Sequence, residues 1–264
     1  MVQRFQKLHG VRLKNATGLP SVQINPEDEA MASIPGWKMY LDPVYADLPG
    51  MSIRNRAQPA SHIVGAAAPG AAQMPNGAPA ISLNGADTPR TWTGVGNVAF
   101  NPTAWSMFWV IMPIAIGSAY RWLVRPIDAV STALSPAVRL SGSGNTLALV
   151  ESIPGQDSIR ASWNNAGLAS RTAPSLLMVS FSTQAGVHIF DGGNVVASAP
   201  NDRRPLTGNF AAGAWSLLTV TSSPSGFGLV GEMGLHDIDL SLPVNAGYRR
   251  DIERYLMALN GIPA

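Results

Sequence analysis

Short apolar runs separated by turn residues dominate the chain from Ala80 onward. The runs are rich in β-branched and aromatic residues, a composition typical of strands. Between them stand pairs such as Asp-Gly, Gly-Asn and Pro-Gly, which suit the backbone conformations of tight turns. The pattern predicts strands at Ile81–Asn84, Ser106–Met112, Tyr120–Val124, Val138–Leu140, Thr146–Glu151, Ser158–Ser162, Leu176–Ser182, Val187–Asp191, Val195–Ser198, Ser216–Thr221 and Gly231–Leu240. Many short strands joined by turns predict a sandwich or a barrel.

One amphipathic helix is expected near the end of the sequence. Its apolar positions fall at i, i+3, i+4 and i+7, on one helical face: Ile252, Tyr255, Leu256 and Leu259. Asn245, which follows Pro243 by two residues, is the predicted N-cap, and Gly261 is placed to end the helix. We expect the apolar stripe to pack on the sandwich.

The N-terminal segment has a different character. Met1–Ser33 is polar, contains Pro20 and Pro26, carries an acidic cluster at residues 27–29, and shows no sustained hydrophobic period. Such a segment is either a surface tail or an arm that becomes ordered against another subunit. We therefore expect an arm over residues 1–33 and a single domain over residues 34–264. Within that domain, the residues at 57–80 are rich in Ala, Gly and Pro and predict a loop with one short strand at Ser61–Gly65.

Composition narrows the class of protein. Charged residues make up 13 % of the chain and hydrophobic residues 46 %, whereas about a quarter of an average soluble chain is charged. Low charge indicates a surface that partners cover in part. The formal charge is only +2, and Lys and Arg form no long basic track, so nucleic acid is not an expected partner. The chain has no cysteine, which excludes disulfides and cysteine metal ligands.

One uncharged stretch, Ala104–Tyr120, is long enough to raise the question of a membrane span. Pro113 interrupts it, and its centre is aromatic and β-branched, so we interpret it as a buried strand followed by a loop. The basic residues near the N-terminus precede no apolar run of the kind that a secretion signal needs. We expect no membrane association, and we expect the chain to be synthesised in a cytoplasm.

Four segments, in this order and spacing over residues 34–262, resemble one known family. They are Ile34–Asp42 (IPGWKMYLD), Ile81–Asp87 (ISLNGAD), Phe190–Val196 (FDGGNVV), and Gly231–Asp239 followed by Arg250–Ile262. Together they resemble the concanavalin A-like lectin/glucanase domain, in the laminin-G-like form found in tailed-phage virion proteins and bacterial surface proteins. The resemblance implies an all-β fold: a two-sheet antiparallel jelly-roll sandwich with a short C-terminal helix, here preceded by an extended N-terminal arm.

The sequence shows no catalytic motif of the hydrolases in that family. Those enzymes place paired carboxylates on one strand, often as E-x-D-x-x-E, and this pattern is absent. Asp237 and Asp239 share a strand face, but we interpret them as solvated turn or edge residues. There is no G-x-S-x-G elbow. The four histidines, His9, His62, His188 and His236, are scattered without metal-ligand spacing, and we expect His188 and His236 to be packed or surface residues. We therefore predict a protein that is not an enzyme.

Two kinds of binding site are expected from residue type. Lectins of this shape hold sugars with an aromatic platform and nearby amides or carboxylates. The glycan-binding candidates are Trp92, Trp163, Asn164, Asn165, Asn201, Asp202 and Arg203. The alternative is that these tryptophans pack in the core, as we expect for Trp37, Trp105, Trp109 and Trp215. Laminin-G-like modules often bind calcium through loop oxygens, and the candidate metal ligands are Asp87, Asp191 and Asn194. No other cofactor is expected.

Three functional classes follow. The first is a non-enzymatic structural, decoration or fibre protein of a phage virion, assembled in the host cytoplasm. It would dock to other virion subunits through its arm, form a homo-oligomer, and bind a host cell-surface polysaccharide. The alternative is a carbohydrate-binding lectin module of a bacterial surface protein, and a glycoside hydrolase is the third class. This ranking rests on fold-level resemblance, because the residues define no site by themselves.

Overall fold

The structure is a computed structural model of the 264-residue chain. It describes residues 26–47, 52–58, 62–65, 70–82, 92–93, 98–113, 121–126, 135–141, 145–153, 156–205, 215–220 and 228–263. The chain divides into two units, Met1–Ile34 and Pro35–Ala264. The uncharged stretch Ala104–Tyr120, interpreted above as a buried strand followed by a loop, begins with a strand at Ala104–Met112. No helix among the described residues has the length and hydropathy to cross a bilayer.

The described part of the first unit is a helix, α1 (Pro26–Ser33), which the hydrophobic pattern does not predict. The helix has no apolar stripe, so it gives no periodic signal. Its local sequence nevertheless suits a helix start, because Pro fits the first helical position and the acidic residues at 27–29 lie where the helix dipole favours negative charge. The Ser33 hydroxyl donates to the Ala30 carbonyl at 2.7 Å near the other end.

The second unit is built from antiparallel strands. Their bounds are β1 (Trp37–Asp47), β2 (Ser52–Asn55), β3 (His62–Gly65), β4 (Gly70–Gln73), β5 (Pro79–Ser82), β6 (Trp92–Thr93), β7 (Ala104–Met112), β8 (Arg121–Pro126), β9 (Ser135–Leu140), β10 (Thr146–Ile153), β11 (Gln156–Asn164), β12 (Ser175–Ser182), β13 (Gly186–Asp191), β14 (Asn194–Ala199), β15 (Trp215–Val220) and β16 (Leu229–His236). The short 3₁₀ turns η1 (Leu168–Ser170) and η3 (Pro243–Asn245) and the helix α2 (Ala246–Asn260) complete the described elements.

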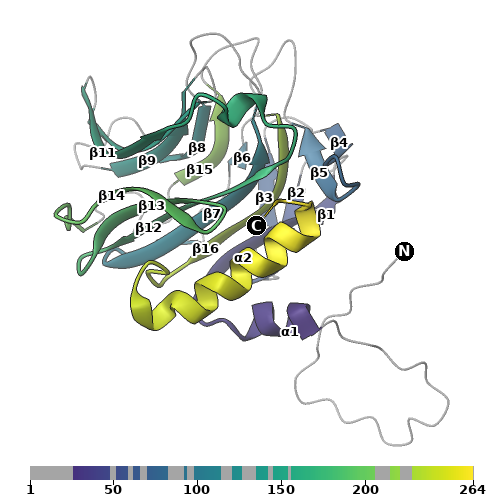
Figure 1. Cartoon of the computed structure of the whole chain (residues 1–264), viewed down its shortest axis with the longest axis horizontal. Coiled ribbons are helices and arrows are strands. Elements are labelled where there is room, and N and C mark those ends of the chain that lie inside the picture. The colour runs from purple at the N-terminus through teal and green to yellow at the C-terminus, as the bar shows by residue number, and fades with distance from the viewer. Residues whose placement is uncertain are drawn as a thin grey trace, which may run out of the picture. The chain divides into compact units, whose positions relative to one another are not determined.

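A continuous hydrogen-bonded path joins most of the strands in the order β11-β10-β9-β8-β15-β6-β3-β2-β1-β16-β7-β12-β13-β14, with β5 pairing with β16 and β4 with β5 off that path. The path folds over on itself into two layers (Figure 1). As a result, β11 at one end of the path contacts β13 and β14 at the other. The expected all-β, two-layer antiparallel sandwich with a C-terminal helix is confirmed.

One hydrophobic core lies between the layers. On β7 the alternating residues Trp105, Met107, Trp109 and Ile111 belong to it, as the twofold alternation of a strand requires. The intervening residues of β7 are also buried, and so is every residue of β12. Strands buried on both faces read as continuous apolar runs rather than alternating ones. This explains why β7 resembles a membrane stretch in sequence.

Helix α2 covers the outer face of the layer that contains β16, β12 and β13 (Figure 1). Its buried residues include Ile252, Tyr255 and Leu256 from the predicted stripe, and Gly261 ends it in the left-handed conformation at φ 64°. Asn245 occupies the N-cap position, but its side chain does not cap the helix. The capping prediction is therefore wrong, because the Asn245 amide donates instead to the Asp239 carbonyl at 2.7 Å.

Most predicted strands are present within the described residues, and the differences have local causes. The last predicted strand stops earlier, because β16 ends at His236 and the chain turns at Asp237. The strands β2, β4 and β6 are not predicted, since they are short and their residues are mostly polar or small. The strand β1 is expected only from the resemblance of Ile34–Asp42 to the entry strand of the concanavalin A-like family. Trp105 and Trp109 lie in the core as expected, while Trp37 is half-buried. The side chain of Trp215 lies outside the described part.

Candidate functional site

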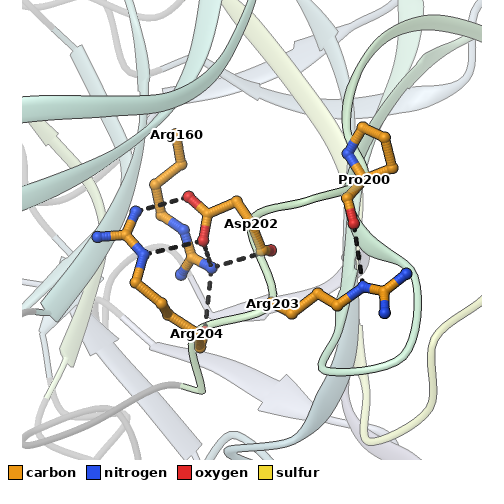
Figure 2. A network of polar contacts seen from close by, with 5 residues as sticks. All are labelled: Arg160, Pro200, Asp202, Arg203 and Arg204. Carbon is orange, nitrogen blue, oxygen red and sulfur yellow. Dashed lines mark hydrogen bonds and ion pairs between the residues drawn. The ribbon is translucent and has the colours of Figure 1, made fainter.

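The segment that follows β14 holds a polar network between the two ends of the strand path (Figure 2). We call residues 200–204 the 200–204 loop. One Nη of Arg160, on β11, donates to Asp202 Oδ1 at 2.7 Å and to the Arg204 carbonyl at 3.0 Å. Arg204 donates from Nε to Asp202 Oδ1 at 3.0 Å and from Nη2 to Oδ2 at 2.6 Å. Asp202 is thus held by two guanidinium groups.

A β-bulge places Arg160 in this network. Leu149 pairs with Ala161 and Val150 with Ile159, so Arg160 is the extra residue on β11. Bulges commonly redirect a side chain from the direction that strand alternation would give it. The Ile159 residue is 56 % exposed, whereas the Arg160 side chain is fully buried. Its guanidinium lies 4.9 Å from the centre of the Phe181 ring, a cation–π arrangement that adds to its fixed position.

The electrostatics of Asp202 follow from these contacts. Partial burial favours the neutral acid, but the hydrogen bonds and positive charges of Arg204 and Arg160 outweigh burial and lower the pKa of Asp202 to about 2. Asp202 is therefore ionised at neutral pH, and both its oxygens are occupied. Its backbone N–H also donates to the Ala199 carbonyl at 3.1 Å. These bonds fix the backbone of the loop, so Asp202 acts as a positioning residue.

Three polar side chains of the loop reach solvent. Asn201, Arg203 and Arg204 are all exposed. Arg203 donates from Nε to the Pro200 carbonyl at 3.1 Å, and its guanidinium extends away from Asp202 (Figure 2). An open hollow of about 520 Å³ lies beside the loop, lined by Ala199, Pro200, Asn201, Asp202 and Arg204. The predicted candidates Asn201, Asp202 and Arg203 thus lie on one fixed surface segment.

The second predicted group, Trp163 to Asn165, lies at the end of β11. Trp163 is half-buried and packs against the core, as the core interpretation expects. The Asn165 side chain accepts from Gly167 N at 2.9 Å, which stabilises the turn after the strand. Asn164 is exposed. Trp163 and Asn164 lie on β11, the strand that also carries Arg160. The candidates Asn201–Arg203 are linked to this strand through the hydrogen bond from Arg160 to Asp202.

The remaining candidates lie apart from this network. Trp92 is in β6, opposite Leu217 and Gly65, and its side chain lies outside the described part. Asp87, a predicted metal ligand, also lies outside the described residues. The other two metal candidates flank the β13–β14 turn. Both carboxylate oxygens of Asp191 accept from Arg171, at 3.1 and 2.8 Å. Exposed Asn194 donates to the Gly192 carbonyl at 3.4 Å.

A calcium ion at Asp191 would have to displace the Arg171 guanidinium, which occupies both carboxylate oxygens. Calcium binding at this turn is therefore only a prediction from the family resemblance. Among the described residues no three His, Cys, Asp or Glu side chains are gathered as they would be around a metal ion.

The solvated interpretation of Asp239 is wrong. Asp239 is 1 % exposed and accepts from the Ser182 hydroxyl at 2.5 Å and from Ser241 N at 2.8 Å. These hydrogen bonds compensate for the burial of its carboxylate. Asp237 is half-buried and forms an ion pair with Lys38 at 3.0 Å. The two carboxylates therefore serve the turn between β16 and α2.

Sequence reasoning missed Arg160, the buried centre of the network. An isolated Arg in a predicted strand carries no signal of its function, and strand alternation misplaces a residue at a bulge. The usable signal lies elsewhere, in the Asn201–Arg204 run of polar residues directly after a strand.

No protein-family model matches the chain, and no curated protein matches it in sequence. Solved structures match it in fold. The binding domain of botulinum neurotoxin DC, in complex with SialylT, has a TM-score of 0.58 and 8 % identity over 85 % of this chain and 52 % of that chain. Botulinum neurotoxin type C, whose cell entry depends on two ganglioside molecules, gives 0.57 and 10 % over 84 % and 53 %. Trypanosoma rangeli sialidase in complex with sialic acid gives 0.57 and 12 % over 89 % and 38 %.

The chain spans about half the length of the neurotoxin structures and less of the sialidase. Structural similarity at such low sequence identity shows a shared fold, here a β-sandwich, and does not transfer the roles of individual residues. The neighbours include binding domains as well as an enzyme. The laminin-G-like form and a phage origin remain predictions.

Proposed function

We propose that this chain is a β-sandwich binding module that holds a surface glycan on the 200–204 loop, and that it is not an enzyme. The observation that carries the proposal is the fixed position of the loop. A buried guanidinium, Arg160, anchors Asp202 at 2.7 Å, while Asn201 and Arg203 stay exposed. Binding groups that are held in place before the ligand arrives lose less conformational entropy on binding.

The chemistry of the exposed side chains suits a sugar. A sugar hydroxyl needs both donors and acceptors, and the Asn201 amide provides both. The Arg203 guanidinium provides further donors in a planar fork. The open hollow that Asn201 lines also includes Ala199 and Pro200, against whose apolar atoms the C–H face of a sugar ring can pack. The likeness to a sialidase in complex with sialic acid, and to a neurotoxin whose cell entry depends on two ganglioside molecules, supports the same class of ligand.

A glycan array probed with the full-length chain tests this proposal. We expect binding to a limited set of glycans, and we expect Asn201→Ala to weaken that binding, because the amide contacts are lost. Asn164→Ala is the matched control, since Asn164 is an exposed amide on the other predicted group. If Asn164→Ala abolishes binding and Asn201→Ala leaves it intact, the site belongs at Trp163–Asn165 instead.

The proposal that the chain is not an enzyme is tested with sialyllactose, because a sialidase is among its structural neighbours. We expect no release of free sialic acid above a buffer control after prolonged incubation with the full-length chain. Release that scales with protein concentration would place the chain among the glycosidases.

We infer further that the module works in an assembly, as a virion structural, decoration or fibre protein made in a host cytoplasm. Two observations favour this second function: the low charged fraction of 13 %, and a separate N-terminal unit over Met1–Ile34. Its partners would be other virion subunits and further copies of the chain.

Light scattering on the full-length chain and on a chain lacking residues 1–33 tests the assembly role. We expect defined oligomers for the full-length protein and monomers after deletion, with circular dichroism showing that the strands are retained. If the full-length and the truncated chains are both folded and have the same oligomeric state, the arm does not mediate assembly.

A further inference from the structure

We propose that the ligand of the 200–204 loop is an acidic sugar, and that Arg203 binds its carboxylate. This inference rests on the glycan-binding function proposed above and specifies the class of glycan. It assigns different tasks to the three arginines around Asp202: Arg160 and Arg204 position the loop, and Arg203 contacts the ligand.

The local charge favours an anion. Arg160 and Arg204 both form ion pairs with the one carboxylate of Asp202. Arg203 adds a positive charge to the loop, and within the described residues its guanidinium contacts only the Pro200 carbonyl. Because Asp202 stays ionised under two guanidiniums, its charge is already balanced within the protein. An incoming carboxylate at Arg203 therefore meets a positive charge that none of the described carboxylates pairs with.

The geometry of Arg203 suits a carboxylate. Its Nε is bonded to the Pro200 carbonyl at 3.1 Å, which fixes the plane of the guanidinium. The two terminal nitrogens point away from Asp202 (Figure 2) and have no partner within the described part of the chain. A planar pair of donors with a fixed orientation matches the two oxygens of a carboxylate in a bidentate contact, which is among the stronger hydrogen-bonding arrangements in proteins.

The surroundings of Asp202 separate positioning from binding. Arg204 donates to both Asp202 oxygens, and Arg160 holds the Arg204 carbonyl as well as the Asp202 side chain. These contacts fix the loop backbone on both sides of Arg203. Asn201, on the other side of Asp202, is exposed and lines the hollow. Arg203 is hydrogen-bonded to Pro200, which lines the same hollow, so a sugar held by its carboxylate at Arg203 would extend over Pro200 toward this amide.

Calorimetric titration of the full-length chain with 3′-sialyllactose and with lactose tests the inference. We expect sialyllactose to bind and lactose to bind at least about tenfold more weakly, in line with the strength of hydrogen bonds to charged groups. Arg203→Ala should reduce sialyllactose affinity to the level of lactose. Arg203→Lys should restore part of the loss, because it keeps the charge and loses the fork. Arg254→Ala is the control, since Arg254 is an exposed arginine on α2.

The outcomes separate this inference from the proposed function. Equal binding of lactose and sialyllactose would overturn the acidic-sugar assignment and leave the glycan-binding function intact. Loss of sialyllactose binding in Arg254→Ala but not in Arg203→Ala would overturn the role of Arg203. Displacement of sialyllactose by an equal concentration of inorganic sulfate would show that Arg203 binds simple anions without selecting a sugar, and it would overturn the acidic-sugar assignment. An absence of binding to both probes and to every glycan on an array would overturn the proposed function itself.

Discussion

At the scale of single residues, Trp37 shows how closely side chains fit around β16. Its ring lies 3.7 Å from the His236 ring, measured between centroids, and 5.9 Å from Phe108 in an edge contact. His236 is fully buried, and its Nδ1 lies 3.2 Å from the Pro35 carbonyl. Gly234 lies against the Phe108 and Trp37 rings, where any side chain would enter occupied space. The residue types at 37, 234 and 236 are therefore interdependent.

Gly234→Ala should destabilise the fold by about 2–3 kcal/mol, the upper part of the usual range for overpacking a core. A Cβ at this position would overlap the Phe108 ring and lie 2.7 Å from Trp37 Cζ3. Gly247→Ala is the matched control, because nothing lies within 4 Å of its Cβ, and a helical alanine should add up to about 1 kcal/mol of stability. Urea unfolding measures both, and equal stabilities for the two variants would contradict the packing described.

His236 should make the fold less stable in acid. Burial lowers its pKa from 6.5 to about 4, although the Pro35 carbonyl and the charge of Asp237 act in the opposite direction. Because the folded pKa lies below the unfolded one, the contribution is fully present above pH 6.5 and is lost progressively as pH falls from 6.5 to about 4. The total loss is on the order of 3 kcal/mol.

The comparison is between the wild-type chain and His236→Gln, with the free energy of unfolding measured at several values across that pH window. Asp237, with its partner Lys38, is the charged group nearest to this ring in the sequence, and it is present in both proteins. The wild type should lose stability faster than the variant on acidification. Parallel curves would show that His236 does not titrate in this window.

At the scale of elements, the turn between β16 and α2 is held by hydroxyls of the sheet. Ser106, on β7, is fully buried; its Oγ accepts from Leu240 N at 2.8 Å and donates to the Ile238 carbonyl at 2.9 Å. Asp239 accepts from Ser182 on the neighbouring β12. These bonds connect the start of the C-terminal segment to the sheet, so the path to α2 depends on polar residues in otherwise apolar strands.

Ser106→Ala should cost about 1–3 kcal/mol, because it leaves the Leu240 N–H and the Ile238 carbonyl without this buried partner. Amide hydrogen exchange should rise first in Leu240–Asn245, at the entry to α2. Ser162→Ala is the control, since Ser162 is exposed on β11. Unchanged exchange at Leu240 in Ser106→Ala would mean that the hydroxyl does not hold the turn.

The elements that could be predicted from the sequence are those in which the pattern of apolar residues matches the pattern of buried positions. The long buried strand β7 and the helix α2 were predicted close to their observed bounds, because an apolar run and a helical stripe are strong signals. β4, with the sequence GAAQ, has no such signal. It forms because β5 offers it a pairing edge. Asn245 likewise has the right residue type for a cap, but the Asp239 carbonyl competes for its side chain.

At the scale of the whole molecule, the two ends of the strand path meet at the candidate site. β11 and β14 contact each other but do not share a ladder, and Arg160 links them through Asp202. The contact between β11 and β14 could not be predicted from local sequence patterns, since it depends on how the whole strand path folds into two layers. The candidates after β14 were predictable from their residue types, whereas their anchor on β11 was not, because only the bulge directs Arg160 to them.

The most direct test of the proposed site is an NMR titration of the isotopically labelled full-length chain with 3′-sialyllactose. The account predicts saturable shifts centred on residues 199–204 and on the Arg160 side chain, with Trp163–Asn165 unaffected. Saturable shifts confined to Trp163–Asn165, or spread over strands remote from β14, would contradict the placement of the glycan site on the 200–204 loop.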